Sequence, residues 1–282
     1  IYNGHSSMGK SKATTTAMNV VAPTAHPLYV GSLEKGFRVL AAFGDDCAAL
    51  GVTEIALRTG LDKSAAQRFS NTLHQLGFLE KDTSTRRYRP ARKLMELAFT
   101  YLRHSSLGAA AMPRLIEAGA VYQTTMNLAE REDTDLIYTV RIPHQKAAYV
   151  ATVPGRRIPM YCTATGHAIL SQMPADEAED IINRSILTEH LPGTMTDPKE
   201  IMKTVRKARR NGFASTFAQL LPREIGIAAP IVDYRGRPVG AVHIPAYTPG
   251  WTVANARQKL GTLAIETADA ISGALLASGQ KF

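Results

Sequence analysis

The chain has 282 residues, of which 45% are hydrophobic and 20% are charged, and its formal net charge is +9. This length is typical of about two domains, and the balance of residue types excludes collagen-like, coiled-coil and wholly disordered proteins. The excess of basic residues is compatible with a nucleic-acid partner but does not by itself require one.

The longest notable apolar stretch, Ile225 to Val232, is much shorter than the roughly 18 residues that cross a bilayer. No basic segment followed by an apolar core stands at the start of the chain, and two cysteines cannot form a disulfide framework. We therefore expect a cytoplasmic protein without a membrane partner.

Residues 1–29 are rich in Ser, Thr, Ala and Gly and have no apolar period, which predicts a disordered tail. The string from Gly4 to Ser11 matches a P-loop. That motif binds phosphate only between a strand and a helix, and the residues on either side favour neither. No nucleotide and no other cofactor is predicted.

Residues 30–92 are predicted to form a winged helix-turn-helix domain. Its first helix is capped by Ser32, and its spacing predicts that Leu33, Phe37 and Leu40 point inward. The run Gly44-Asp45-Asp46 is predicted to break this helix.

A second short helix, capped by Thr53, is predicted to end at Gly60, because glycine accepts the positive φ of a tight turn. The third helix is predicted over about residues 62–76. Its inward side chains are predicted to be Phe69, Leu73 and Leu76. Three short helices in this arrangement indicate a helix-turn-helix.

The third helix presents polar side chains along its N-terminal half, the part that enters a DNA major groove in this geometry. Gln, Asn and Arg side chains can pair with base edges. The predicted DNA-binding residues of this helix are Lys63, Ser64, Ala65, Gln67, Arg68 and Asn71. The alternative is a solvated polar face on a small helical domain.

A β-hairpin is predicted directly after this helix, with strands at about 78–82 and 86–89 joined by a turn at 83–85. Three arginines of the second strand, Arg86, Arg87 and Arg89, are predicted to contact DNA phosphates. Such a hairpin is the wing of a winged helix.

Pro90 is predicted to start a helix that continues through the linker segment, 93–108. An α+β domain with an antiparallel sheet is predicted at 109–282. The predicted helices of that domain lie at about 112–129, 164–171, 176–183, 198–210 and 253–277, and the predicted strands at about 136–142, 213–217, 224–232 and 239–246.

From about Leu33 to Ala277 this layout resembles the IclR family of transcriptional regulators. The motifs that carry the resemblance include Ser32 to Gly36, Lys63 to Leu79, Gly155 to Pro159, Ala164 to Leu170 and Gly226 to Ile231. The resemblance implies a winged helix followed by a GAF-like effector-binding domain. It also implies a dimer, or a dimer of dimers, that binds a palindromic double-stranded DNA operator and responds to a small molecule.

The resemblance also implies where the effector binds: at Cys162, Thr163, Ala164, Thr216, Gly226 and His243. Gly226 stands where the family commonly has Cys, and His243 where it commonly has Ser. A glycine enlarges a pocket and a histidine adds a polar group, so a larger, aromatic organic acid is predicted. The alternative for His243 is a strand histidine that faces solvent or core.

Three other interpretations remain weaker. Cys162, Thr163 and His167 lie close together, but no second motif supplies the base and oxyanion donors of an enzyme, so no catalytic residue is predicted. Cysteine and histidine lack the spacing of a metal site, so no metal is predicted. The basic run from Lys203 to Arg210 is predicted to be a solvated face.

The runner-up function is a small-molecule binding or interaction protein whose winged helix contacts only proteins. Salt dependence separates this class from a DNA-binding regulator, because each phosphate contact releases counterions and apolar contacts release none.

Overall fold

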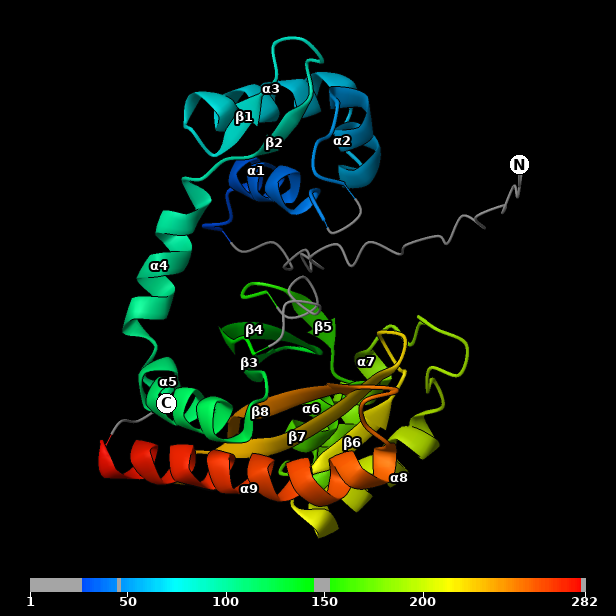
Figure 1. The fold of residues 1–282 in the computed structure, drawn as a ribbon. Helices are drawn as coiled ribbons and strands as arrows, with labels where there is room; N and C mark the ends of the chain where they lie inside the picture. The colour runs from blue at the N-terminus through cyan, green and yellow to red at the C-terminus, as the bar shows by residue number, and fades with distance from the viewer. Residues whose placement is uncertain (1–26, 45–46, 145–152, 280–282) are drawn as a thin grey trace, which may run out of the picture. The chain divides into compact units, whose positions relative to one another are not determined.

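The computed structural model describes residues 27–44, 47–144 and 153–279. The predicted tail therefore lies outside the described residues except for its last three, as do the P-loop string and the pair Asp45-Asp46. The chain divides into two compact units, Ile1–Tyr101 and Leu102–Phe282, and the division falls within helix α4 (Figure 1). Each unit is described by itself.

Unit 1 has the order of elements of a winged helix. Its elements are α1 (Gly31–Ala41), α2 (Val52–Thr59), α3 (Lys63–Gln75), β1 (Leu79–Lys81), β2 (Tyr88–Pro90) and most of α4 (Leu94–His104). Gly60 ends α2 with a φ of +68°, as its position in the predicted turn requires, and β1 pairs antiparallel with β2. The helix-turn-helix and its wing are thus confirmed.

The core of unit 1 differs from the prediction at helix α1. Leu33 and Phe37 are 60% and 58% exposed, whereas Val39 is buried. In so small a unit, only the side of α1 that meets α2 and α3 has anything to pack against. The buried core consists of Val39, Ala42, Leu50, Ile55, Ala66, Leu73, Leu79 and Tyr88.

Other predicted details of unit 1 were wrong. The cap of α2 is Gly51, not Thr53, because the Gly51 N–H donates to the Glu54 side chain in a capping box. Leu76 is 52% exposed because it lies past the end of α3. Pro90 closes β2 and does not start α4, and no residue of α4 is buried.

Unit 2 contains a wholly antiparallel sheet with the strand order β5-β4-β3-β8-β7-β6 among the described residues. Its strands are β3 (Met126–Glu132), β4 (Asp135–Ile142), β5 (Arg157–Pro159), β6 (Ala214–Phe217), β7 (Glu224–Val232) and β8 (Pro238–Tyr247). Its helices are α5 (Ser106–Tyr122), α6 (Ala164–Leu170), α7 (Ala175–Arg184), α8 (Pro198–Asn211) and α9 (Val253–Ala277).

Two strands were missed by the sequence analysis, and one helix was extended too far. The helix predicted over 112–129 ends at Tyr122, and Met126 to Ala129 belong to β3. The segment β5 was not predicted. The other predicted helices and strands of this unit are present with ends within about two residues of the prediction.

The sheet is covered on both faces, which makes unit 2 a three-layer structure (Figure 1). Helices α5 and α9 pack on one face through residues such as Leu115, Leu263 and Ile271. Helix α6 packs on the other face, with α7 and α8 outside it. Helix α9 is long and apolar enough to cross a membrane, but half of its most apolar window is buried, as in a core helix of a soluble protein.

Candidate functional site

The exposed face of α3 carries most of the predicted base-reading residues. The Asp62 side chain caps the helix by accepting from the Ala65 N–H at 2.8 Å. Ala66, Ser70 and Leu73 face the core, so the opposite side of the helix is turned to solvent. The side chains exposed there are Lys63, Ser64, Gln67, Arg68 and Asn71, while Ala65 is half-buried.

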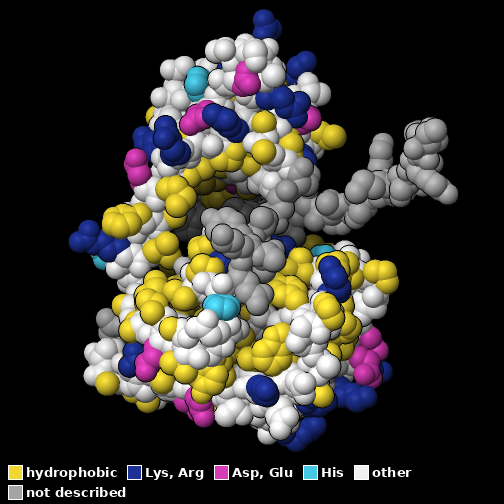
Figure 2. All heavy atoms as spheres, in the orientation of Figure 1, with side chains coloured by type: hydrophobic (Ala, Val, Ile, Leu, Met, Phe, Trp, Pro, Cys, Tyr) yellow, Lys and Arg dark blue, Asp and Glu magenta, His cyan; other side chains and the backbone are white. Residues whose placement is uncertain are grey.

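The three wing arginines differ in their surroundings. Arg86 is exposed at the hairpin with a φ of +56°, and no hydrogen bond or ion pair joins it to another described residue. Arg89 pairs with Glu80, directly opposite it on β1, at 2.7 Å. Basic side chains, with acidic ones between them, lie over α3 and the hairpin (Figure 2).

Arg87 is an anchor of the wing. Its guanidinium donates to the Ala49 carbonyl at 2.9 Å and pairs with Glu54 at 2.8 Å, which ties β2 to the start of α2. Two hydrogen bonds lower the pKa of Glu54: the one from the Gly51 N–H has the larger effect, and the one from the Arg87 guanidinium comes second. Arg87 is predicted to hold a phosphate, and in this structure its Nε and Nη2 already bond within the protein.

The hairpin turn is held by Asp82. Its carboxylate accepts from the Ser84 hydroxyl and from the N–H groups of Ser84 and Thr85, at 2.6 to 3.0 Å. These donors lower the pKa of Asp82 to about 2, so the carboxylate stays ionised at every physiological pH. The turn therefore keeps its shape without help from a ligand.

Unit 2 contains a cavity between the sheet and the start of α6. Its volume is about 30 Å³, room for about two water molecules. It is lined by all six residues predicted for the effector: Cys162, Thr163, Ala164, Thr216, Gly226 and His243. It is also lined by Tyr138, Arg156, Ile158, Thr165, Gln219, Leu220, Leu221 and Glu224.

A row of polar side chains crosses four neighbouring strands at the cavity wall. The His243 Nδ1 lies 3.0 Å from the Tyr138 hydroxyl and 3.3 Å from the Asn127 Nδ2. The Asn127 amide nitrogen also donates to the His243 carbonyl at 3.4 Å, which identifies it as the NH₂ group. The His243 Nε2 lies 3.5 Å from the Glu224 carboxylate.

The hydrogen bonds of this row fix its protons. Burial, with a smaller contribution from the Glu224 charge, raises the pKa of Tyr138, so its phenol stays protonated and donates. Since two donors point at the His243 Nδ1, that nitrogen accepts and the proton of the neutral ring sits on Nε2. The Nε2–H then faces Glu224, so His243 is a buried wall residue of the cavity.

Gly226 leaves open the space in front of the His243 Nε2. A Cβ atom at position 226 would lie 3.0 Å from the Thr216 hydroxyl, 3.2 Å from the Ala164 Cβ and 3.6 Å from the His243 Nε2. Any larger side chain would therefore fill part of the cavity. This matches the expected effect of glycine at this position.

The neighbouring Cys162 and His167 have structural surroundings. Burial raises the pKa of the Cys162 thiol to about 12, so the thiolate needed by a nucleophile is not formed near neutral pH. Burial lowers the pKa of His167 to about 4, and its Nε2 donates to the Tyr161 carbonyl at 2.6 Å. The described residues hold no group of three or more metal-ligating side chains.

The hydroxyl of Thr163 is already used within the fold. It accepts from the Gly166 N–H at 3.2 Å and donates to the Pro159 carbonyl at 2.8 Å, which caps α6. Gly166 itself packs directly on the Met160 backbone, where a Cβ would have no room. Thr163 therefore lines the cavity, but its hydroxyl is already hydrogen-bonded within the protein.

The rim of the cavity is formed by the loop between β6 and β7. Ala218 and Arg223 stand at its ends with φ angles of +46° and +62°, values that are costly for residues other than glycine. Gln219 ties the loop to residues 193–195: its amide accepts from the Met195 N–H and donates to the Gly193 carbonyl.

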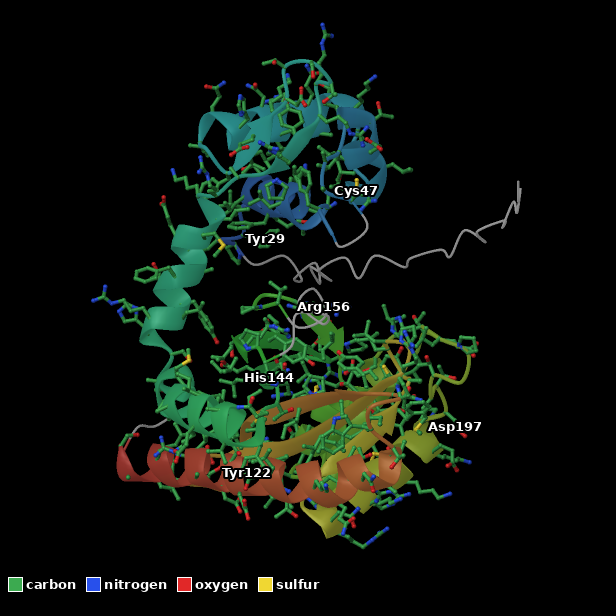
Figure 3. The ribbon with its side chains drawn as sticks, viewed as in Figure 1. Tyr29, Cys47, Tyr122, His144, Arg156 and Asp197 are labelled. Atoms are coloured by element: carbon green, nitrogen blue, oxygen red, sulfur yellow. The ribbon has the colours of Figure 1, made fainter. Side chains whose placement is uncertain are left out.

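Eight residues that line the cavity were not predicted from the sequence, among them Tyr138, Arg156, Gln219 and Glu224. Glu224 could have been found, because it stands two residues before Gly226 and alternate residues of a strand share a face. Tyr138 required the pairing of β3 with β4 and β8. Arg156, labelled in Figure 3, directly precedes β5, a strand too short to predict.

The basic run on α8 is largely a solvent-facing surface. Arg209 donates to the carbonyls of Ser171 and Met173 at 2.6 and 2.7 Å, and the helix begins next to Asp197, labelled in Figure 3. Lys203, Arg206, Lys207 and Arg210 are exposed.

Two family profiles match the chain. Residues 99–273 match "Bacterial transcriptional regulator IclR C-terminal", and residues 32–83 match the IclR helix-turn-helix domain. The chain is 27% identical over 232 residues to the Pca regulon regulatory protein of Pseudomonas putida, covering 82% of this chain and 79% of that protein. It is 27% identical over 225 residues to the p-hydroxybenzoate hydroxylase transcriptional activator of Acinetobacter baylyi, covering 78% and 82% of the two chains.

Solved structures share both the fold and this level of identity. A transcriptional regulator of Rhodococcus sp. RHA1 matches with a TM-score of 0.75 and 25% identity, covering 89% of this chain and 100% of that chain. An IclR homologue of Microbacterium hydrocarbonoxydans, solved in complex with 4-hydroxybenzoate, matches with a TM-score of 0.70 and 25% identity. That match covers 86% of this chain and 98% of the homologue.

Proposed function

Because the chain belongs to the IclR family of bacterial transcriptional regulators, we propose that it binds a palindromic operator through unit 1 and an aromatic organic acid in the cavity of unit 2. The observation that carries the first part is the polar, solvent-facing side of α3, with an exposed Arg86 at the adjacent hairpin. Effector binding then shifts the population between arrangements that do and do not hold the operator.

In this proposal, the α3 side chains Lys63, Ser64, Gln67, Arg68 and Asn71 reach base edges in the major groove. Arg86 and Arg89 lie beside the groove at the backbone phosphates, and Arg87 holds the wing in place for them. Ala65 is half-buried at the start of the helix. Its small side chain lets α3 approach the DNA closely and makes no hydrogen bond to it.

The ligand class is supported by the cavity and by the relatives. The six residues predicted for the effector line one cavity together with Arg156, which supplies the positive charge for an acid. One relative was solved with 4-hydroxybenzoate, and another is named as the activator of p-hydroxybenzoate hydroxylase. A benzoate ring exceeds the present volume, so binding needs a wider cavity, and the part that we propose to move is the rim at Gln219 to Leu221.

A homo-oligomer, dimer or dimer of dimers, is part of the proposal. Large apolar side chains of α1 and α4 are exposed, among them Phe37 at 58% and Met95 at 67%, and they gather over these two helices (Figure 2). Exposed apolar patches of this kind mark protein interfaces. Two copies related by a two-fold axis also match the symmetry of a palindrome.

Operator binding is tested with the full chain and the DNA upstream of its own gene, with unrelated DNA as competitor, over a salt series. We expect specific binding that weakens steeply as salt rises, because each phosphate contact releases counterions. Binding that ignores both sequence and salt would support the alternative, an interaction protein whose winged helix contacts only proteins. Genome-wide fragments, tested with and without benzoates, cover the case of a distant operator.

A further inference from the structure

The wall of the cavity contains a glutamate carboxylate, which is unusual in a site that binds an organic acid. Glu224 lines the cavity with its side chain 16% exposed. Among the described residues, the only polar contact of its carboxylate is the His243 Nε2 at 3.5 Å, longer than a good hydrogen bond. Its oxygens therefore have acceptor capacity left on the cavity side.

The charge of Glu224 restricts how an acid can enter. A ligand carboxylate placed against Glu224 would meet a like charge in a partly buried site, which is strongly unfavourable. Arg156 is the only Lys or Arg among the described residues that line the cavity. The ligand carboxylate therefore belongs with Arg156, and the group that reaches Glu224 must be a hydrogen-bond donor.

His243 adds a second requirement at the same point. Its Nδ1 is occupied by the Tyr138 hydroxyl and the Asn127 amide, so its Nε2–H is the group it offers to a ligand. This N–H faces the space above Gly226 that a Cβ would occupy. An atom in that space would accept from His243 and donate to Glu224, and a hydroxyl oxygen does both.

We propose that the Glu224–His243 pair is a hydroxyl-recognition site, and that the effector is a hydroxylated aromatic acid whose hydroxyl lies above Gly226. Tyr138 and Asn127 are positioning residues, since their bonds to Nδ1 set the tautomer of His243. This inference rests on the proposed effector class and adds the group that selects within it.

The test starts from the unmodified full chain and a series of benzoates, measured by isothermal titration calorimetry. The probes are benzoate, the three monohydroxybenzoates, and the methyl ether of the best of them. We expect the best hydroxybenzoate to bind about tenfold or more tightly than benzoate, because hydrogen bonds to a charged group are the strong ones. The methyl ether should lose this advantage, because its oxygen accepts but cannot donate.

Variants of Glu224 then assign the preference to this residue. Glu224→Met keeps the length of the side chain and removes the acceptors, so benzoate and hydroxybenzoate should bind within about twofold of each other. Glu224→Gln keeps one acceptor oxygen and should retain part of the preference. Glu132→Met, an exposed glutamate at the end of β3, is the matched control and should keep the full preference. Thermal unfolding and operator binding establish that each variant is folded.

The outcomes separate this inference from the proposed function. Equal affinity for benzoate and every hydroxybenzoate would overturn the hydroxyl site and leave the aromatic acid standing. A full preference retained by Glu224→Met would also overturn it. If no benzoate binds the unmodified protein, both the hydroxyl site and the aromatic effector class are wrong, whereas operator binding is judged separately by its salt series.

Discussion

At the scale of single residues, His167 is a buried histidine that serves the fold of unit 2. It is 1% exposed, its Nε2 donates to the Tyr161 carbonyl at 2.6 Å, and its Nδ1 lies 3.2 Å from the Thr204 hydroxyl of α8. It therefore links α6 to α8 in its neutral form. Burial lowers its pKa to about 4, which couples this link to pH.

The sign of this coupling follows from the two pKa values. In the unfolded chain a histidine has a pKa of about 6.5, so between about pH 6.5 and pH 4 the unfolded state binds a proton that the folded state does not. The stabilising contribution is complete above this window and is lost as pH falls through it. When the pH is lowered from 7 to 5, His167 should therefore reduce the free energy of unfolding of unit 2 by about 2 kcal/mol.

Urea unfolding at pH 7 and pH 5 measures this loss, with His167→Gln as the variant without a titrating group. At pH 7 the variant should be less stable than the unmodified protein. Between pH 7 and pH 5, however, its free energy of unfolding should fall by about 2 kcal/mol less than that of the unmodified protein. His144→Gln, which changes an exposed histidine, should behave like the unmodified protein. Equal losses in all three proteins would contradict the buried neutral state.

At the scale of elements, the wing depends on a contact outside itself. Arg87 of the hairpin segment bonds to the Ala49 carbonyl and to Glu54, so its guanidinium fixes the hairpin against the start of α2. Arg86, the preceding residue, has no such contact among the described residues. Two adjacent arginines therefore have different roles, one in the structure of the wing and one at its surface.

Alanine substitutions separate these roles. Arg86→Ala should leave the unfolding free energy unchanged, weaken operator binding for all sequences, and reduce the slope of log affinity against log salt by about 1. Arg87→Ala should lower stability only modestly, since its partners are partly exposed. Glu54→Gln should reproduce part of the Arg87→Ala loss. The assignment fails if Arg87→Ala changes the salt slope as much as Arg86→Ala and leaves stability unchanged.

The elements also show what could be predicted from sequence. The helix-turn-helix, the wing and helix α9 followed from hydrophobic period and turn residues, which are local signals. Strand β3 did not, because Met126 to Ala129 is a short, fully buried run whose composition suits a helix as well as a strand. Only its pairing with β4 and β8 decides between them, and that is a tertiary contact.

The site was predictable to a similar extent. Its six expected residues came from the family resemblance, and the structure gathers them around one cavity. The role of Arg87 was not predictable, because its partners Ala49 and Glu54 lie more than 30 residues away in sequence. Tyr138 needed the strand order, since it lies on β4, whereas the spacing of Glu224 to Gly226 on β7 was a local signal.

At the scale of the whole molecule, several large apolar side chains of α1 and α4 are exposed in the part of the chain that the structure describes. Leu33, Phe37, Met95, Leu97 and Phe99 are each between 58% and 67% exposed. Keeping so many large apolar groups in water is costly, at about 25 cal/mol per Å². In the proposed oligomer, a second copy of the chain covers them.

Phe37→Ser tests this oligomer. By sedimentation, the variant should shift toward a smaller species, and it should bind a full palindrome more weakly, because two half-sites are no longer held together. Binding to a single half-site should change little. Leu57→Ser is the matched control, since Leu57 is 85% exposed on α2, and it should leave the mass unchanged. An unchanged mass for Phe37→Ser would place the interface elsewhere.

The cavity wall contains two kinds of position, and this difference bears on how its ligand preference can evolve. Tyr138 and Asn127 both bond to the His243 Nδ1, so replacing His243 leaves two buried polar groups without this partner. Gly226 has no side chain and takes part in no such network, although a Cβ there would enter the cavity. A change at position 226 can therefore reshape the pocket in a single mutational step. Libraries that aim to convert this protein into a biosensor for other acids should begin at that codon.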